Sequence, residues 1–147
     1  MTLPTIRVKT LRKNAILPKY GSAYAAGADL SAALDTPAAI APGETKLIPT
    51  GLAMEIPLGY AGLIYARSGL ASKRGLAPAN KVGVVDADYR GEVMVALHNH
   101  SAEIQEVAPG ERIAQLVIAP FLAVHYEAAE GLDDTVRGAG GFGSTGV

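Results

Sequence analysis

The sequence predicts an all-β domain, either a sandwich or a jelly-roll-like barrel, with one short helix. Its 17 glycines and 9 prolines lie between short apolar segments rather than in one linker, a distribution typical of many strands joined by turns. No window of about eleven residues keeps the apolar spacing of an amphipathic helix. The 147 residues, 49% of them hydrophobic and 18% charged, are sufficient for one domain around a single core.

The expected strands are short, rich in β-branched residues and often alternate in polarity. In chain order they span residues 5–9, 45–48, 52–56, 62–66, 93–98, 104–107, 113–118 and 123–126. Residues 26–30 form a further apolar strand with one carboxylate, Asp29, and Gln115 lies within an apolar strand, where its amide needs partners. Four prolines lie at or beyond strand ends, where the missing backbone N–H is not needed: Pro49, Pro57, Pro109 and Pro120.

One short helix is expected over residues 68–73, with Ser68 as its N-cap. The free backbone N–H groups of its first turn then lie beside Arg67, which suits the binding of a phosphate. Arg67, Ser68 and Gly69 together offer a cation, a hydroxyl and a permissive backbone. This segment is therefore a candidate phosphate-binding loop.

The chain divides into a β domain over residues 1–136 and a Gly-rich C-terminal arm over residues 137–147. The arm has one large apolar side chain, Phe142, so it cannot pack as a strand on its own and should be mobile. It also offers exposed backbone N–H groups and three polar side chains: Arg137, Ser144 and Thr145. Such groups suit a lid that grips an anionic ligand and stacks on a base, whereas a plain flexible tail is the simpler alternative.

Composition excludes several partners and chemistries. Thirteen Lys and Arg residues against fourteen Asp and Glu leave a net charge of −1, so no positive field favours a nucleic acid. The longest apolar run, residues 116–124, contains a proline and is too short to span a membrane. The absence of cysteine excludes disulfides and thiolate chemistry and fits a cytoplasmic location. With no tryptophan and 5% aromatic residues, the lean aliphatic core favours a partner subunit.

Two carboxylates two residues apart mark the middle of the chain. Asp86 and Asp88 lie in a segment bounded by Gly83 and Gly91, which we expect to be a β-hairpin whose two acids share a face. Asp86 would serve as a magnesium ligand or as a general base that holds a water, whereas solvated acids of a turn are the simpler alternative. Tyr89 of the same segment either walls a sugar or belongs to the core.

In this order along the chain, these segments resemble the five motifs of the trimeric dUTP pyrophosphatases. The matching segments span residues 26–30, 67–70, 83–91, 110–115 and 137–146, so the resemblance covers nearly the whole chain. It implies a distorted jelly-roll-like barrel of the β-clip type, assembled as a homotrimer with active sites shared between subunits. It also implies Mg²⁺-assisted hydrolysis of dUTP to dUMP and pyrophosphate, which keeps uracil out of DNA and supplies dUMP for thymidylate synthesis.

The resemblance also implies a role for each matching residue. Asp86 corresponds to the base that activates water for in-line attack on the α-phosphorus, Tyr89 to the ring that excludes a ribose 2′-hydroxyl, and Asp29 to an acid near the hydrated metal. The uracil pocket would be formed by Asn80, Val84, Val85 and Met94, and the triphosphate would contact Arg67, Ser68, Gly69 and Gln115. The lid over a neighbouring subunit's site, with Phe142 stacked on uracil, would use Arg137, Phe142, Gly143, Ser144 and Thr145.

Two other functions stay open from the sequence. A dCTP deaminase-like enzyme would share the fold and some motifs, but it needs an acid placed for proton transfer at the pyrimidine amino group. No motif of that kind is found beyond the Asp86 segment. A non-enzymatic jelly-roll protein would bind a nucleotide or a partner and use the arm as a docking peptide. Ammonia release from dCTP would identify the first, and pyrophosphate release from dUTP would exclude the second.

Overall fold

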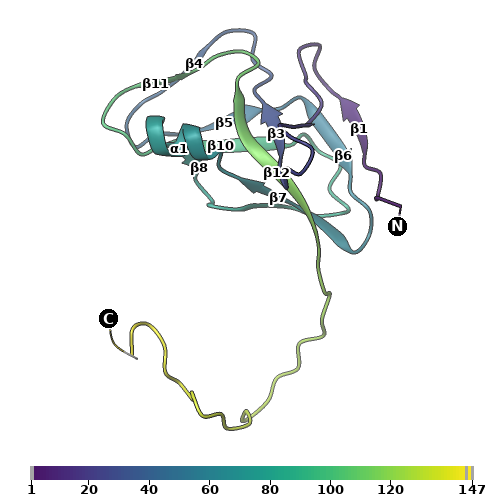
Figure 1. Ribbon diagram of the computed structural model, residues 1–147, viewed down its shortest axis with the longest axis vertical. Coiled ribbons are helices and arrows are strands. Elements are labelled where there is room, and N and C mark those ends of the chain that lie inside the picture. Colours follow the sequence, from purple (N-terminus) through teal and green to yellow (C-terminus); the bar gives the residue numbers. More distant parts are fainter. Residues whose placement is uncertain (1, 145, 147) are drawn as a thin grey trace.

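The computed structural model describes residues 2–144 and 146. Within them the chain forms twelve strands and one helix (Figure 1). The strands are β1 (Arg7–Thr10), β2 (Lys19–Tyr20), β3 (Ala28–Ser31), β4 (Ala38–Ile40), β5 (Thr45–Pro49), β6 (Leu52–Glu55), β7 (Tyr60–Tyr65), β8 (Leu76–Pro78), β9 (Gly83–Val85), β10 (Met94–Asn99), β11 (Gln105–Val107) and β12 (Arg112–Pro120). The helix, α1 (Ser68–Arg74), follows β7. No helix in this part of the chain is long and apolar enough to cross a membrane.

The strands pair antiparallel in two main sheets and two smaller pairs. The larger sheet has the order β2-β3-β12-β7-β9 and the second has the order β5-β10-β8, while β1-β6 and β4-β11 form the pairs. The longest strand, β12, lies between β3 and β7. Most neighbouring strands are distant in sequence, which is the arrangement of a jelly roll. The expected all-β fold with one short helix is therefore confirmed.

The core lies between the sheets and is aliphatic. Its largest fully buried side chains include Leu30, Ile40, Ile48, Leu52, Leu97 and Ile113. Along β10, buried residues alternate with less buried ones, as expected for a strand with one face on the core. No aromatic side chain among the described residues is fully buried. The side-chain amide of Asn99, which is fully buried, donates to the carbonyls of Ile40 and Glu103 at 2.9 and 2.7 Å, so its burial is compensated by hydrogen bonds.

The helix differs from its expected form at the first residue, and the prediction of Ser68 as N-cap is wrong. The N-cap is Arg67, which has extended backbone (φ −85°, ψ 129°) and makes no side-chain cap hydrogen bond. Because the Ala71 N–H donates to the Arg67 carbonyl at 3.0 Å, the first turn closes one residue earlier. The helix ends at Arg74 and is capped by Gly75, whose left-handed backbone (φ 65°, ψ 21°) suits glycine.

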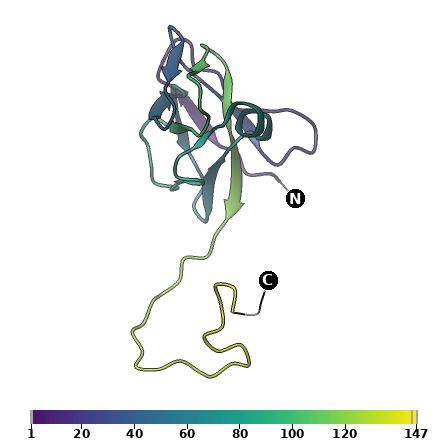
Figure 2. The same ribbon diagram turned by 90° about the vertical axis from the view of Figure 1, so that its left-hand side faces the viewer.

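Two expectations about strands are also wrong. Residues 123–126 form no strand, because the chain has left the body there and no strand lies beside them (Figure 2). The Asp86 segment is no β-hairpin, because β9 pairs with β7 whereas β10 pairs with β5 and β8. Residues 86–93 instead cross from the larger sheet to the second sheet.

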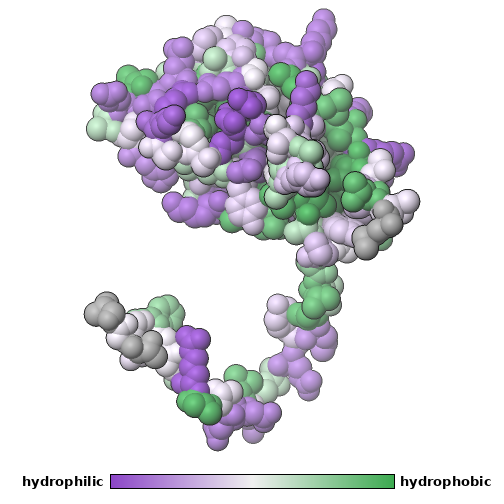
Figure 3. All heavy atoms as spheres, in the orientation of Figure 1, coloured by the Kyte–Doolittle hydropathy of each residue, from purple (hydrophilic) through white to green (hydrophobic). Residues whose placement is uncertain are grey.

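Beyond β12 the chain extends away from the body (Figures 1 and 2). The Phe121 N–H donates to the Gly59 carbonyl at 3.0 Å, and the later backbone hydrogen bonds of the described residues join arm residues to one another. Six large apolar side chains along this segment are exposed: Phe121, Leu122, Val124, Tyr126, Leu132 and Val136. Apolar side chains also gather on the body beside the root of the arm (Figure 3). The chain beyond β12 therefore buries little of its own apolar surface in a single chain.

Candidate functional site

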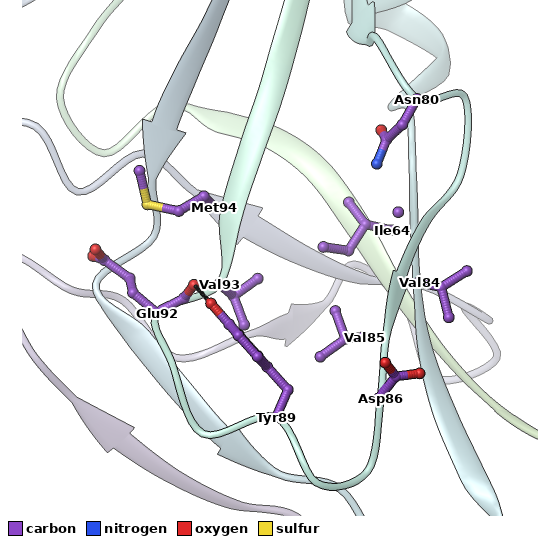
Figure 4. A pocket seen from close by; sticks show the side chains of 10 residues that line it. Ile64, Asn80, Val84, Val85, Asp86, Tyr89, Glu92, Val93 and Met94 are labelled. Carbon is purple, nitrogen blue, oxygen red and sulfur yellow. Dashed lines mark hydrogen bonds between the residues drawn. The ribbon is translucent and has the colours of Figure 1, made fainter.

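A pocket of about 240 Å³ lies where β7, β9 and the 86–93 crossing segment meet (Figure 4). Its lining residues are Ile64, Asn80, Gly83, Val84, Val85, Asp86, Tyr89, Glu92, Val93 and Met94. Asn80, Val84 and Asp86 lie along one side, and Tyr89, Glu92 and Met94 lie along the other. The structure thus brings together the residues of the 1–136 segment that the sequence assigned to base and sugar recognition, with Asp86 among them. We call this cavity the β9 pocket.

Strand β9 supplies one wall of the β9 pocket and is an edge strand of the larger sheet. It pairs with β7 through Gly83 opposite Ile64 and Val85 opposite Gly62, so its other edge keeps backbone N–H and C=O groups for a ligand. A Cβ at Gly83 would lie 3.2 Å from Asn80 Nδ2. The absence of a side chain there lets the Asn80 amide approach the strand.

The Tyr89 ring is held in place within the crossing segment. Its hydroxyl donates to the Glu92 carbonyl at 2.8 Å, an interaction drawn in Figure 4. The ring also lies against Gly91, where a Cβ would come within 2.5 Å of the Tyr89 hydroxyl oxygen. Glycine at position 91 is thus required for this ring position.

Glu92 anchors the crossing segment to the rest of the fold. Its carboxylate accepts hydrogen bonds from Arg12 Nε at 2.6 Å, Arg12 Nη2 at 3.0 Å and the Gly51 N–H at 3.0 Å. The hydrogen bond from Arg12 holds the pKa of the Glu92 carboxyl below its usual value, although burial opposes the shift. The ion pair is therefore formed at neutral pH. Neither residue was singled out from the sequence, because 80 positions separate them and neither belongs to a motif with Asp86.

A second pocket, of about 230 Å³, lies where β3, β12 and the start of α1 meet. Its lining residues are Gly21, Ala25, Gly27, Asp29, Arg67, Ser68, Gly69 and Gln115. All the residues that the sequence assigned to triphosphate and metal therefore lie together, although they come from separate segments of the chain. We call this cavity the α1 pocket.

The α1 pocket is organised by a carboxylate between two guanidinium groups. Asp29 Oδ1 accepts a hydrogen bond from Arg67 Nε at 2.8 Å, and Asp29 Oδ2 accepts one from Arg112 Nη1 at 3.2 Å. Gln115 Nε2 donates to the Ala66 carbonyl at 2.8 Å, and this hydrogen bond fixes the main chain just before the candidate phosphate-binding loop at residues 67–69. Two cations thus face one carboxylate, and the first N–H groups of α1 lie beside them. This excess of positive charge and of donors makes the pocket suitable for a polyanion.

Asp29 is also the one acidic residue that lines the α1 pocket. No group of three or more His, Cys, Asp or Glu side chains able to hold a metal ion occurs in the part of the chain that the structure describes. A site with one carboxylate fits Mg²⁺, which commonly keeps several waters and takes its other ligands from substrate phosphates. The donor set is therefore compatible with a metal that arrives with a phosphorylated ligand.

The predicted lid residues that the structure describes lie in the arm and line neither pocket. Arg137 Nε donates to the Gly140 carbonyl at 2.7 Å, and the Ser144 N–H donates to the Gly141 carbonyl at 3.0 Å, so this part of the arm turns on itself. Phe142 is fully exposed, and Gly143 has a positive φ of 85°. Thr145 lies outside the described residues.

Comparisons with known proteins agree over nearly the whole chain. The dUTPase family model matches residues 13–146. A deoxyuridine 5′-triphosphate nucleotidohydrolase of Desulfitobacterium hafniense is 50% identical over 145 residues, which are 97% of this chain and 96% of that protein. A solved Staphylococcus bacteriophage 80alpha dUTPase with dUPNHPP has a TM-score of 0.86 and 32% identity, over 99% of this chain and 100% of that one. A mutant dUTPase from phage phi11 of S. aureus, solved for the coordination of a structural Mg(II) ion, has a TM-score of 0.77 and 28% identity, over 87% and 98% of the chains.

Proposed function

Because this chain belongs to the dUTPase family and hydrolyses dUTP to dUMP and pyrophosphate, we propose that its two pockets bind the two ends of this substrate. The β9 pocket takes the deoxyuridine and the α1 pocket takes the triphosphate. The observation that supports this assignment is how the predicted contacts of residues 1–136 are distributed. The predicted nucleoside contacts among them line one pocket, and the predicted phosphate contacts among them line the other.

Uracil recognition rests on the free edge of β9 and on Asn80. The backbone of Val84 and Val85 offers fixed donors and acceptors, and the Asn80 amide adds one of each. A cytosine ring presents an amino group where uracil presents a carbonyl, so dCTP would leave buried polar groups without partners. This arrangement accounts for selectivity against cytosine.

The Tyr89 ring provides selectivity for the deoxyribose. We expect Tyr89→Ala to raise the ratio of kcat/KM for UTP to that for dUTP by about tenfold or more, because removal of the ring opens the space that a 2′-hydroxyl needs. Steady-state pyrophosphate release with both substrates measures this ratio. Tyr89→Phe keeps the ring and loses only the hydroxyl that donates to the Glu92 carbonyl, so it should raise the ratio less than Tyr89→Ala does. An unchanged ratio in the alanine variant would remove Tyr89 from this role.

The triphosphate is neutralised by Arg67 and by the N–H groups of Ser68 and Gly69, while Gln115 holds the start of this loop. Asp29 would hold Mg²⁺ through water, with the phosphates as its direct ligands. When bound, this ion would neutralise phosphate charge and so make the α-phosphorus more electrophilic. The relative from phage phi11, whose structure concerns a Mg(II) ion, supports the choice of metal.

Asp86 is the group that we assign as general base. Its carboxylate accepts a proton from a water molecule, the water oxygen bonds to the α-phosphorus, and the bond from that phosphorus to the bridging oxygen of the β-phosphate breaks. Pyrophosphate leaves with the bonding electrons, and dUMP remains. Holding the water in line with the leaving oxygen is the main contribution of the site.

The arm supports a homotrimer with shared sites. The two pockets share no lining residue, and the chain beyond β12 leads away from the body (Figure 1). Its exposed apolar side chains need a surface on another copy. In this assembly residues 1–136 form the nucleotidohydrolase domain and residues 137–147 close over a neighbouring subunit's site, where Phe142 stacks on uracil.

Gly27 is expected to be essential for the α1 pocket. A Cβ at this position would lie 2.3 Å from Gln115 Oε1, so Gly27→Ala displaces the Gln115 amide and releases the Ala66 carbonyl. We expect kcat/KM for dUTP to fall by about 10- to 100-fold. Gly21→Ala is the matched control, because this glycine lines the same pocket and has nothing within 4 Å of its added Cβ. Equal activity of the two variants would contradict the placement of Gln115.

The proposed selectivity is tested by pyrophosphate release from dUTP, UTP, dCTP and dTTP, with and without Mg²⁺. We expect turnover of dUTP alone at an appreciable rate, and a strong decrease when the metal is chelated. Ammonia release from dCTP is measured in the same samples. Release of ammonia, or metal-independent turnover, would contradict the assignment of the pockets.

A further inference from the structure

The Arg12–Glu92 ion pair joins the β9 pocket to a segment of the chain that lines no part of it. Arg12 lies between β1 and β2, and its guanidinium meets the Glu92 carboxylate through two nitrogens at 2.6 and 3.0 Å. The Glu92 side chain is 19% exposed and that of Arg12 is 46% exposed. A two-point contact to a half-buried carboxylate is more geometrically specific than an ordinary surface ion pair.

The same residue, Glu92, holds the Tyr89 ring through its backbone. The Tyr89 hydroxyl donates to the Glu92 carbonyl at 2.8 Å, so the main chain at Glu92 and the wall of the pocket are joined directly. The Glu92 carboxylate is thus bound by residues that do not line the pocket, Arg12 and Gly51, while its carbonyl binds the Tyr89 ring of the pocket wall (Figure 4).

The turn between β5 and β6 completes this connection. Its Gly51 N–H donates to Glu92 Oε1 at 3.0 Å, and its Gly51 carbonyl accepts a hydrogen bond from the Leu11 N–H at 2.7 Å. On the other side of Glu92, the Val93 N–H donates to the Leu52 carbonyl at 2.8 Å. Hydrogen bonds therefore attach the crossing segment to Gly51 and Leu52, and a further hydrogen bond attaches Leu11, the residue before Arg12, to Gly51.

We infer that Arg12 is a positioning residue for discrimination between deoxyribose and ribose. By holding the Glu92 carboxylate at two points, it fixes the main chain to which the Tyr89 ring is bonded, and so fixes the space that the ring leaves for the sugar. The inference rests on the proposed role of Tyr89. Lysine would not replace arginine here, because an ammonium group presents no planar fork to a carboxylate.

The test compares kcat and KM for dUTP and UTP in Arg12→Gln, Arg12→Lys, Glu92→Gln and Tyr89→Ala. In the two Arg12 variants and in Glu92→Gln, we expect the ratio of kcat/KM for UTP to that for dUTP to rise about three- to tenfold. The kcat for dUTP should change by a smaller factor than this ratio. The decisive arm is Arg12→Gln in a Tyr89→Ala background. There the ratio should equal that of Tyr89→Ala alone, because the ring through which Arg12 acts is absent.

Arg7→Gln is the matched control, since it removes an arginine from an exposed ion pair with Glu55 and should leave the ratio unchanged. Thermal midpoints and subunit assembly are measured for every variant, and Arg12→Lys serves as the test if Arg12→Gln does not fold. A raised ratio in Tyr89→Ala with an unchanged ratio in the Arg12 variants would overturn the inference alone. An unchanged ratio in Tyr89→Ala would instead contradict the proposed role of the tyrosine. A further, additive effect of Arg12→Gln in the double variant would show that Arg12 acts by another route and would also overturn it.

Discussion

The Asp86→Asn variant should still bind dUTP and should hydrolyse it about 10²- to 10⁴-fold more slowly than the parent protein. The amide keeps the shape of the side chain at the mouth of the β9 pocket, but it does not accept a proton from water. The pocket itself is built by neighbouring residues and by the edge of β9, so affinity should change little. Pyrophosphate release measures turnover, and calorimetric titration with dUTP measures binding.

Asp88→Asn is the matched control for this experiment. Asp88 lies two residues further along the same crossing segment, is exposed, and lines neither pocket. The two substitutions remove the same charge, so a general loss of negative potential would affect both variants alike. We expect Asp88→Asn to stay within about threefold of the parent. Turnover of Asp86→Asn within about tenfold of the parent would mean that the base lies elsewhere.

Removal of the arm should have an effect of similar size. A chain that ends at Asp134 lacks Arg137, Phe142 and the hydroxyls beyond them, so the site loses the groups that we propose close over the nucleotide. We expect a decrease in kcat/KM of about a hundredfold or more. The body should remain folded, because the backbone hydrogen bonds of the described arm residues from Thr135 onward stay within the arm.

Mixing two inactive chains tests whether the arm acts on a neighbouring subunit. One chain is Asp86→Asn with its arm intact, and the other ends at Asp134 with Asp86 intact. If base and arm come from different subunits, equimolar mixing after unfolding and refolding should place both in about a quarter of the sites. Recovered hydrolysis near that fraction is the expected result. No recovery, in trimers shown by mass to be mixed, would mean that the arm closes over its own subunit.

Several features of the fold were predictable from the sequence because they depend on neighbouring residues. Alternating polarity and β-branched residues identified the long strands β7, β10 and β12, and the arm was recognisable from its glycines. The strands β2, β4 and β8 were missed, since two or three residues show no periodicity. Such strands exist because a partner strand is present, and local pattern contains no information about that partner.

The residues of the candidate site likewise fall into those that the sequence identified and those that it did not. Residues grouped in short segments, such as Arg67, Ser68 and Gly69, were identified by the chemistry of the segment itself and by its likeness to a motif. The sequence by itself thus determined the all-β class, the longer strands and the residue types of each motif. Tertiary structure alone decided that the Asp86 segment crosses between sheets and that Arg12 meets Glu92 across 80 positions. The physical reason is that pairing between strands and ion pairs between distant segments depend on positions in space, which emerge only when the whole core has formed.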